Sequence, residues 1–249
     1  GLFMLLMIFI TAYPLYYCLI ASFSDPIQLA LNPGALFLPL KPFTLSAYQK
    51  VLEHSLFLSG VRNTLFVLCV GTLLNMALTI LTGYALSRKG ALLIMPITFY
   101  IVFTMYFSGG LIPSYLLINN TLQLGNSLWA LILPGAISTW NLLVMRTAFF
   151  SVPQSIEESA FLDGANDFVL LFRIIAPTIM STISVIILFY AVGHWNSWFS
   201  ASIYLRDRTK YPLQLVLREI IILSNVQEMT DASATDDMET VSYTHLRAH

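Results

Sequence analysis

Long apolar stretches alternate with short polar ones along the chain. No Asp, Glu, Lys or Arg occurs in 1–24, 63–87, 90–145 or 174–205. Because a membrane-spanning helix needs roughly 20 consecutive apolar residues, these stretches hold one, one, two and one helices in turn. The pattern predicts an all-α, polytopic membrane protein. The predicted spans are 2–23, 63–87, 91–117, 127–146 and 169–204.

The composition agrees with a chain that lies in lipid. Charged residues make up 10% of the chain and hydrophobic residues 57%, whereas a soluble domain is about 25% charged. The net charge of −1 offers no electrostatic case for a nucleic-acid partner. Cys18 and Cys69 lie inside apolar stretches without other ligands at metal-binding spacing, so no metal site is expected.

Basic residues near the span ends do not decide the orientation of the chain. If 88–90 and 147–172 are cytoplasmic, that side carries four Lys or Arg residues and the opposite side seven. This is the reverse of the usual excess of positive charge on the cytoplasmic side. Orientation must therefore come from another feature.

An acidic, small-residue segment, Ser155–Pro177, interrupts the apolar pattern. Ser155 and Glu158 have the spacing of a capping box, which predicts a short helix from Ile156. Ala160 and Gly164, four residues apart, predict a notch without side chains that a second surface can approach closely. The alternative is an amphipathic connector resting on lipid, but such helices are usually rich in Lys and Arg, and no base occurs here before Arg173.

This segment resembles the cytoplasmic coupling loop of ATP-binding-cassette (ABC) importer permeases. Glu158-Ser159-Ala160 is followed after three residues by Gly164, and nine more bring Ile174, then Ala176-Pro177. The family pattern has Ala and Leu where this chain has Ser159 and Ala176, and every spacing is kept. The resemblance makes 153–168 the coupling loop and places it in the cytoplasm.

Three further segments resemble the carbohydrate-uptake, maltose-permease-like branch of these permeases. They are Ser22–Pro26, Phe107–Pro113 and Gly193–Trp198. The resemblance covers 1–240 and implies a type I ABC importer transmembrane domain with five of its six expected helices. Residues 241–249 fit no element of that family, so we expect a truncated chain with a non-native tail.

The resemblance also implies a function and partners. The chain is expected to be a multi-pass permease subunit that imports a sugar or oligosaccharide across the bacterial cytoplasmic membrane. It is not expected to be an enzyme or to bind a cofactor, because ATP belongs to the partner ATPase. The implied partners are a second permease subunit, two ATPase subunits and an extracytoplasmic solute-binding protein. The implied ATPase-coupling residues are Glu157, Glu158, Ser159, Ala160, Asp163 and Gly164.

Polar and aromatic residues within the spans are candidates for a substrate pathway. They are Asn75, His194, Trp195, Asn196 and Trp198. An aromatic belt is the alternative for the tryptophans, because the 22 steps from Arg173 to Trp195 measure about 33 Å in a helix, which reaches the outer boundary. For Asn75 the alternative is an interhelical hydrogen bond.

An ion-coupled secondary carrier is the rival class of protein. Proton-coupled carriers usually hold ionisable residues within their spans, and the five predicted spans contain only His194. A sodium-coupled carrier that binds the ion through backbone carbonyls stays open. No nucleophile–base pair or carboxylate pair predicts catalysis.

Overall fold

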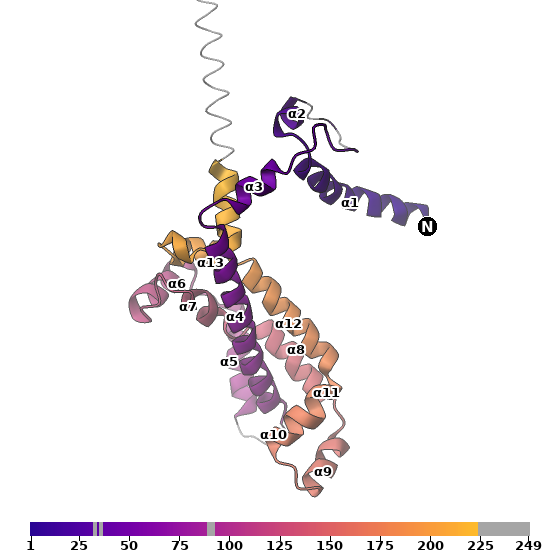
Figure 1. The fold of residues 1–249 in the computed structure, drawn as a ribbon. Helices are drawn as coiled ribbons and strands as arrows, with labels where there is room; N and C mark the ends of the chain where they lie inside the picture. The colour runs from indigo at the N-terminus through magenta and orange to yellow at the C-terminus, as the bar shows by residue number, and fades with distance from the viewer. Residues whose placement is uncertain (32–33, 35–36, 89–92, 224–249) are drawn as a thin grey trace, which may run out of the picture. The chain divides into compact units, whose positions relative to one another are not determined.

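The computed structural model describes residues 1–31, 34, 37–88 and 93–223. The chain divides into two compact units, Gly1–Leu58 and Ser59–His249, which are described separately. Figure 1 shows helices and connecting loops, and the described residues contain no β-strand. The predicted tail, 241–249, lies outside the described residues.

The first unit is built around α1 (Leu2–Ser22), with the short helices α2 (Pro26–Leu31) and α3 (Ser46–Leu52) after it. α1 matches the first predicted span and stays helical through Pro14. Most of its surface is apolar and exposed, as a helix in lipid requires. The Ser24 hydroxyl is buried, accepts from Leu40 N and donates to the carbonyl of Ile20, which ties the end of α1 to the loop after it.

The second unit is organised along α4 (Phe57–Ser87), a helix of 31 residues that begins six residues before the predicted span. After it, α5 (Ile94–Tyr106) and α6 (Leu111–Leu116) meet at a bend of 114°, with a π-helix, η1 (Leu117–Thr121), continuing α6. The third predicted span is therefore a bent pair. Extended backbone at Phe107 and the positive φ of Gly110 break the helix there.

The fourth predicted span, 127–146, is not a continuous helix. It consists of α7 (Trp129–Ile132), a 3₁₀ turn η2 (Leu133–Gly135) and α8 (Thr139–Phe150). Pro134 lacks the N–H that would continue the helix. Ser138 then starts α8 as a new helix, because its side chain accepts a hydrogen bond from Asn141 N.

The fifth predicted span, 169–204, is also divided. The chain forms α9 (Gln154–Leu162) and α10 (Asp167–Val169), then a π-helix η3 (Leu170–Ile175) and α11 (Ala176–Thr178). It bends by 87° before α12 (Met180–Trp195), and α13 (Trp198–Tyr204) and the 3₁₀ turn η4 (Arg208–Lys210) follow. Residues 213–223 are helical.

Two helices of the described chain, Phe3–Ser22 and Phe57–Ser87, are long and apolar enough to cross a membrane. Counting each bent pair as one span brings the total to four. Hydropathy measures apolar length and does not register the breaks at Pro134 or Ile179, so the third, fourth and fifth predicted spans are interrupted helices in the described chain.

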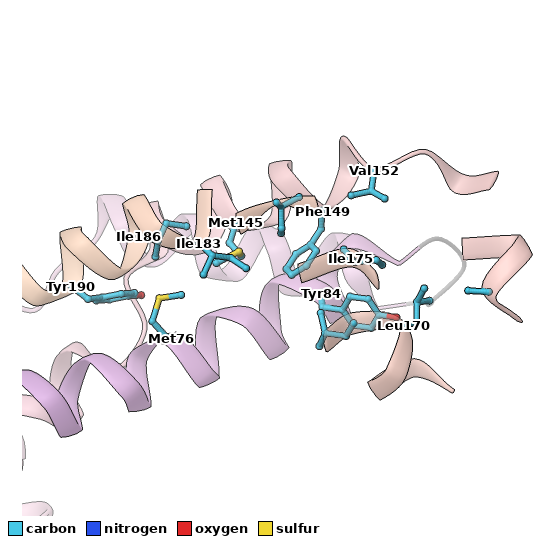
Figure 2. Close-up of a cluster of buried hydrophobic side chains, with 13 residues drawn as sticks. Met76, Tyr84, Met145, Phe149, Val152, Leu170, Ile175, Ile183, Ile186 and Tyr190 are labelled. Carbon is cyan, nitrogen blue, oxygen red and sulfur yellow. The ribbon is translucent and has the colours of Figure 1, made fainter. Parts of the chain in front are cut away.

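Two hydrophobic clusters build the core of the second unit, and α4 contributes to both. One cluster contains Met76 and Tyr84 of α4 with residues of α8, α9, η3 and α12 (Figure 2). The other contains Val67 of α4 with residues of α7, α13 and the segment after it. α4 is therefore the element shared by the coupling segment and the opposite end of this unit.

Candidate functional site

Residues 153–168, which resemble a coupling loop and are called the coupling segment below, contain a helix whose start differs from the prediction. α9 begins at Gln154, with Pro153 at the N-cap and no side-chain cap. Ser155 lies inside the helix, so the predicted capping box is wrong. Pro153 determines the start instead, since its ring fixes φ near the helical value. The Glu158 carboxylate accepts from the Gln154 amide at 2.9 Å, within one turn of the same helix.

The two sides of α9 differ in burial. Ile156 and Ala160 pack into the core cluster of this chain, so Ala160 is not available as part of an outward notch. The opposite side is exposed and consists of Ser155, Glu158, Ser159 and Leu162. Leu162 is 89% exposed, so its side chain is free of contact with the core of this unit among the described residues.

A tight reversal follows α9. Gly164 has φ +81°, a conformation that other residues adopt only with strain, and the Ala165 N–H bonds to the carbonyl of Ala160 at 3.0 Å. Asn166 caps α10 through its side-chain oxygen, which accepts from Val169 N at 2.9 Å. The chain therefore breaks between α9 and α10, and Asp163 is exposed at the turn.

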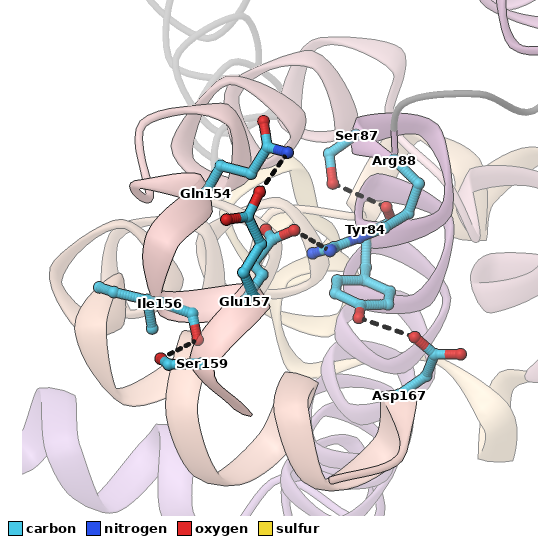
Figure 3. A network of polar contacts seen from close by, with 9 residues as sticks. Tyr84, Ser87, Arg88, Gln154, Ile156, Glu157, Ser159 and Asp167 are labelled. Carbon is cyan, nitrogen blue, oxygen red and sulfur yellow. Dashed lines mark hydrogen bonds and ion pairs between the residues drawn. The ribbon is translucent and has the colours of Figure 1, made fainter. Parts of the chain in front are cut away.

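Glu157 faces the end of α4 and takes part in a polar network (Figure 3). Its carboxylate pairs with the Arg88 guanidinium. The Arg88 guanidinium lies 3.9 Å from the centre of the Tyr84 ring, and the Tyr84 hydroxyl donates to Asp167 at 3.3 Å. Among the implied coupling residues, Glu157 is therefore held inside the chain while Glu158 points outward.

The candidate pathway residues separate into two groups. Asn75 of α4 and His194 of α12 are buried, with Asn75 Nδ2 3.1 Å from His194 Nε2, so the interhelical hydrogen bond is present. Asn75, His194 and Asn196 line an open cavity of about 400 Å³. Asn75 Oδ1 is buried there without a partner among the described residues.

The two tryptophans do not line this cavity. Trp195 is 40% exposed. Trp198 is half-buried against the core cluster around Val67, with the Arg218 guanidinium 3.6 Å from its ring centre. Trp198 therefore packs against other side chains, and neither tryptophan is part of the polar lining of this cavity.

Several residues around these sites have no clear signal in the sequence. Tyr190 of α12 bonds Thr79 Oγ1 at 2.8 Å and accepts from Ser138 N at 3.0 Å, which extends the polar contacts between α4, α8 and α12. Arg88 and Leu162 are equally ordinary in sequence. Only the helical spacing of Leu162 from Ser155, Glu158 and Ser159 could have indicated a shared face.

The chain is similar to transport proteins of known class. It is 38% identical to the polygalacturonan/rhamnogalacturonan transport system permease protein YtcP of Bacillus subtilis over 223 residues, which cover 90% of this chain and 77% of YtcP. It is 38% identical to protein LplC of Bacillus subtilis, over 87% of this chain and 72% of LplC. No model of a known protein family matches the chain.

A solved structure extends the similarity to three dimensions. A bacterial ABC transporter involved in the import of the acidic polysaccharide alginate contains a chain that aligns with a TM-score of 0.84 and 31% identity. The alignment covers 94% of this chain and 83% of that chain. At this identity the shared arrangement of helices reflects common descent as well as common packing.

The helical, apolar fold and these similarities define a membrane transport subunit. The chain belongs to the ABC transporter permease family. It is therefore a permease subunit of an ATP-driven importer and not an ion-coupled carrier or an enzyme, and ATP is hydrolysed on a separate partner. Its apolar helices lie in the membrane.

Proposed function

We propose that the chain imports a sugar or oligosaccharide across the cytoplasmic membrane and that α9 docks on an ATPase subunit on the cytoplasmic side. The observation that carries the proposal is the two-sided burial of α9. Ile156 and Ala160 fix the helix to the core, whereas Glu158, Ser159 and Leu162 project away from it. The names of YtcP and of the alginate transporter support a carbohydrate substrate.

The exposed side of α9 has the chemistry of a small docking surface. Leu162 supplies an apolar anchor and Glu158 a charge beside it, while the small Ser159 allows close approach. Interfaces commonly combine a buried apolar anchor with polar groups at the edge. A basic group on the ATPase is the expected partner of Glu158.

Charge reversal at Glu158 tests the docking role. A close interfacial charge pair contributes about 2 kcal/mol or more, so Glu158→Lys is expected to lower sugar uptake about tenfold or more in the assembled transporter. Gln154→Ala is the matched control, because it removes the bond within α9 and keeps the carboxylate. Undiminished uptake by Glu158→Lys would contradict the docking surface.

Cysteine labelling tests the proposed orientation. Asp163 is exposed at the turn after α9, so a probe that cannot cross membranes should reach Asp163→Cys only from the cytoplasmic side. The native Cys18 and Cys69 are both exposed and should first be replaced by serine. Labelling of intact cells from outside would reverse the orientation.

The open cavity at Asn75 is proposed as part of the sugar pathway. A sugar hydroxyl could supply the donor that Asn75 Oδ1 lacks among the described residues, and a buried acceptor without a donor costs about 1–3 kcal/mol. Asn75→Ala is expected to raise the KM of uptake with little change in basal ATP hydrolysis. Trp198→Phe is the control, because Trp198 packs outside the cavity. An equal rise in KM for both variants would contradict a pathway role that is specific to Asn75.

A further inference from the structure

Two neighbouring glutamates of α9 occupy different surroundings. Glu158 is exposed, whereas the Glu157 side chain is 21% exposed and paired with Arg88, whose side chain is 23% exposed. Successive residues of a helix point about 100° apart, so packing of Ile156 and Ala160 against the core directs Glu157 towards α4. The two carboxylates therefore cannot serve the same partner.

Arg88 is held from two sides at the end of α4. Its guanidinium lies over the Tyr84 ring at 3.9 Å and pairs with the Glu157 carboxylate (Figure 3). The ring face is negative and one turn earlier on the same helix, so it orients the cation towards α9. Partial burial makes this pair stronger than a fully exposed one.

A second contact reaches the other side of the turn at Gly164. The Tyr84 hydroxyl donates to Asp167, the first residue of α10. The end of α4 and the residue after it thus contact both short helices: Arg88 pairs with Glu157 of α9, and Tyr84 bonds Asp167 of α10. The two contacts therefore lie on either side of the turn at Gly164 and hold both short helices near the end of α4.

On this side of α9 the ion pair lies next to a cavity rather than next to tightly packed side chains. An open cavity of about 460 Å³ is lined by Arg88, Glu157, Phe161 and residues 149–154, which run from the end of α8 to the first residue of α9. The ion pair between Arg88 and Glu157 borders this cavity and joins α9 to the end of α4 on this side. Breaking the pair should therefore loosen α9 without removing its buried face from the core.

α4 also carries residues of the proposed pathway. Asn75 and Thr79 lie on α4, which ends one residue before Arg88, and they contact His194 and Tyr190 of α12. The 12 steps from Asn75 to Ser87, the residue before Arg88, correspond to about 18 Å of helix. A displacement of α9 that moved the end of α4 would reach the cavity through one continuous element.

We propose that Arg88 and Glu157 are positioning residues that clamp the coupling helix α9 to α4, so that movement imposed on α9 by the ATPase reaches the helix lining the cavity. The proposal rests on the proposed docking of α9. It assigns Glu157 an internal role and leaves Glu158 and Leu162 as the surface for the partner. Tyr84 and Asp167 form the second contact of the same clamp.

The test uses Arg88→Ala, Glu157→Ala and the exchange of both charges, Arg88→Glu with Glu157→Arg, in the assembled transporter. Two quantities are measured: the amount of ATPase subunit that copurifies, and sugar taken up per ATP hydrolysed. Both single variants should retain the ATPase and lower uptake per ATP by about fivefold or more, the lower limit of typical coupling between sites. The variant with both charges exchanged should recover most of the wild-type sugar uptake per ATP.

Arg208→Ala is the matched control, because it breaks the Arg208–Glu219 ion pair outside this segment and should leave the ratio unchanged. If the single variants fail to assemble, the exchange decides: recovery of coupled uptake supports the clamp, and no recovery overturns it. Single variants with an unchanged ratio also overturn it. A wild-type complex that hydrolyses ATP without moving sugar would instead contradict the proposed function.

Discussion

His194 lies directly against Gly71: a Cβ atom added at Gly71 would lie 2.6 Å from Nε2 of the imidazole. This close approach of α4 and α12 brings Nε2 of His194 to 3.1 Å from Asn75 Nδ2. Small residues allow such approaches between membrane helices. The absent side chain at Gly71 is thus a condition for the polar contact that borders the cavity.

Gly71→Ala should destabilise the packing of α4 on α12. The added methyl group must displace the buried imidazole, and overpacking of this kind typically costs about 1–3 kcal/mol. We expect a lower midpoint of thermal unfolding in detergent and a lower rate of sugar uptake.

Gly193→Ala in α12 is the control, since nothing lies within 4 Å of a Cβ built there. In a helix, alanine is favoured over glycine, so its unfolding midpoint should stay or rise. Equal midpoints for wild type and Gly71→Ala would show that His194 can move aside without cost.

The reversal at Gly164 gives a second prediction. Its φ of +81° places it in the left-handed region, where a residue with a Cβ atom is strained by about 1–2 kcal/mol. Gly164→Ala should make the 163–167 turn more sensitive to limited proteolysis. Gly164→Asn should be milder, because asparagine tolerates this conformation; identical cleavage of both variants and wild type would contradict the strain.

Local features of the chain were predictable from its sequence. The apolar runs of α1 and α4 and the break at Gly164 depend on composition and on single residues with strong backbone preferences. The resemblance to a coupling loop was detectable for the same reason, since its spacing lies within one short stretch. The protein family could therefore be inferred from the sequence alone.

Contacts between distant residues were not predictable. Arg88 and Glu157 are 69 positions apart, and Asn75 and His194 are 119 apart. Helical spacing separates Glu157 from Glu158, but only the packing of Ile156 and Ala160 shows which one turns inward. The orientation of α9 and the divided spans at Pro134 and Ile179 therefore needed the three-dimensional fold.

The turn at Asp207 should depend on pH. The Thr209 hydroxyl and backbone N–H both donate to the Asp207 carboxylate, which lowers its pKa below the ordinary value of an aspartate. Because the pKa of Asp207 is lower in the folded than in the unfolded state, its ionised carboxylate stabilises the turn at pH values above the unfolded-state pKa. This stabilisation is lost as the pH falls through the folded-state pKa. Protection of the Thr209 amide from hydrogen exchange should fall at acidic pH. In Thr209→Val, which keeps the backbone donor, a smaller pKa shift is expected, and an unchanged titration would remove the hydroxyl as a cause.

Asn126 should hold the loop after α13 in place. Its side-chain oxygen accepts from the backbone N–H groups of Arg206 and Asp207 at 3.2 and 3.0 Å, and its carbonyl accepts from Lys210 Nζ at 2.8 Å. Asn126→Ala removes one acceptor for two donors and adds strain at φ +58°, so the amides of 206 and 207 should exchange faster by about tenfold, the equivalent of about 1.4 kcal/mol. Asn126→Asp keeps the acceptor and should remain close to wild type. Slow exchange in Asn126→Ala would show that the loop is held by Lys210 and its other contacts instead.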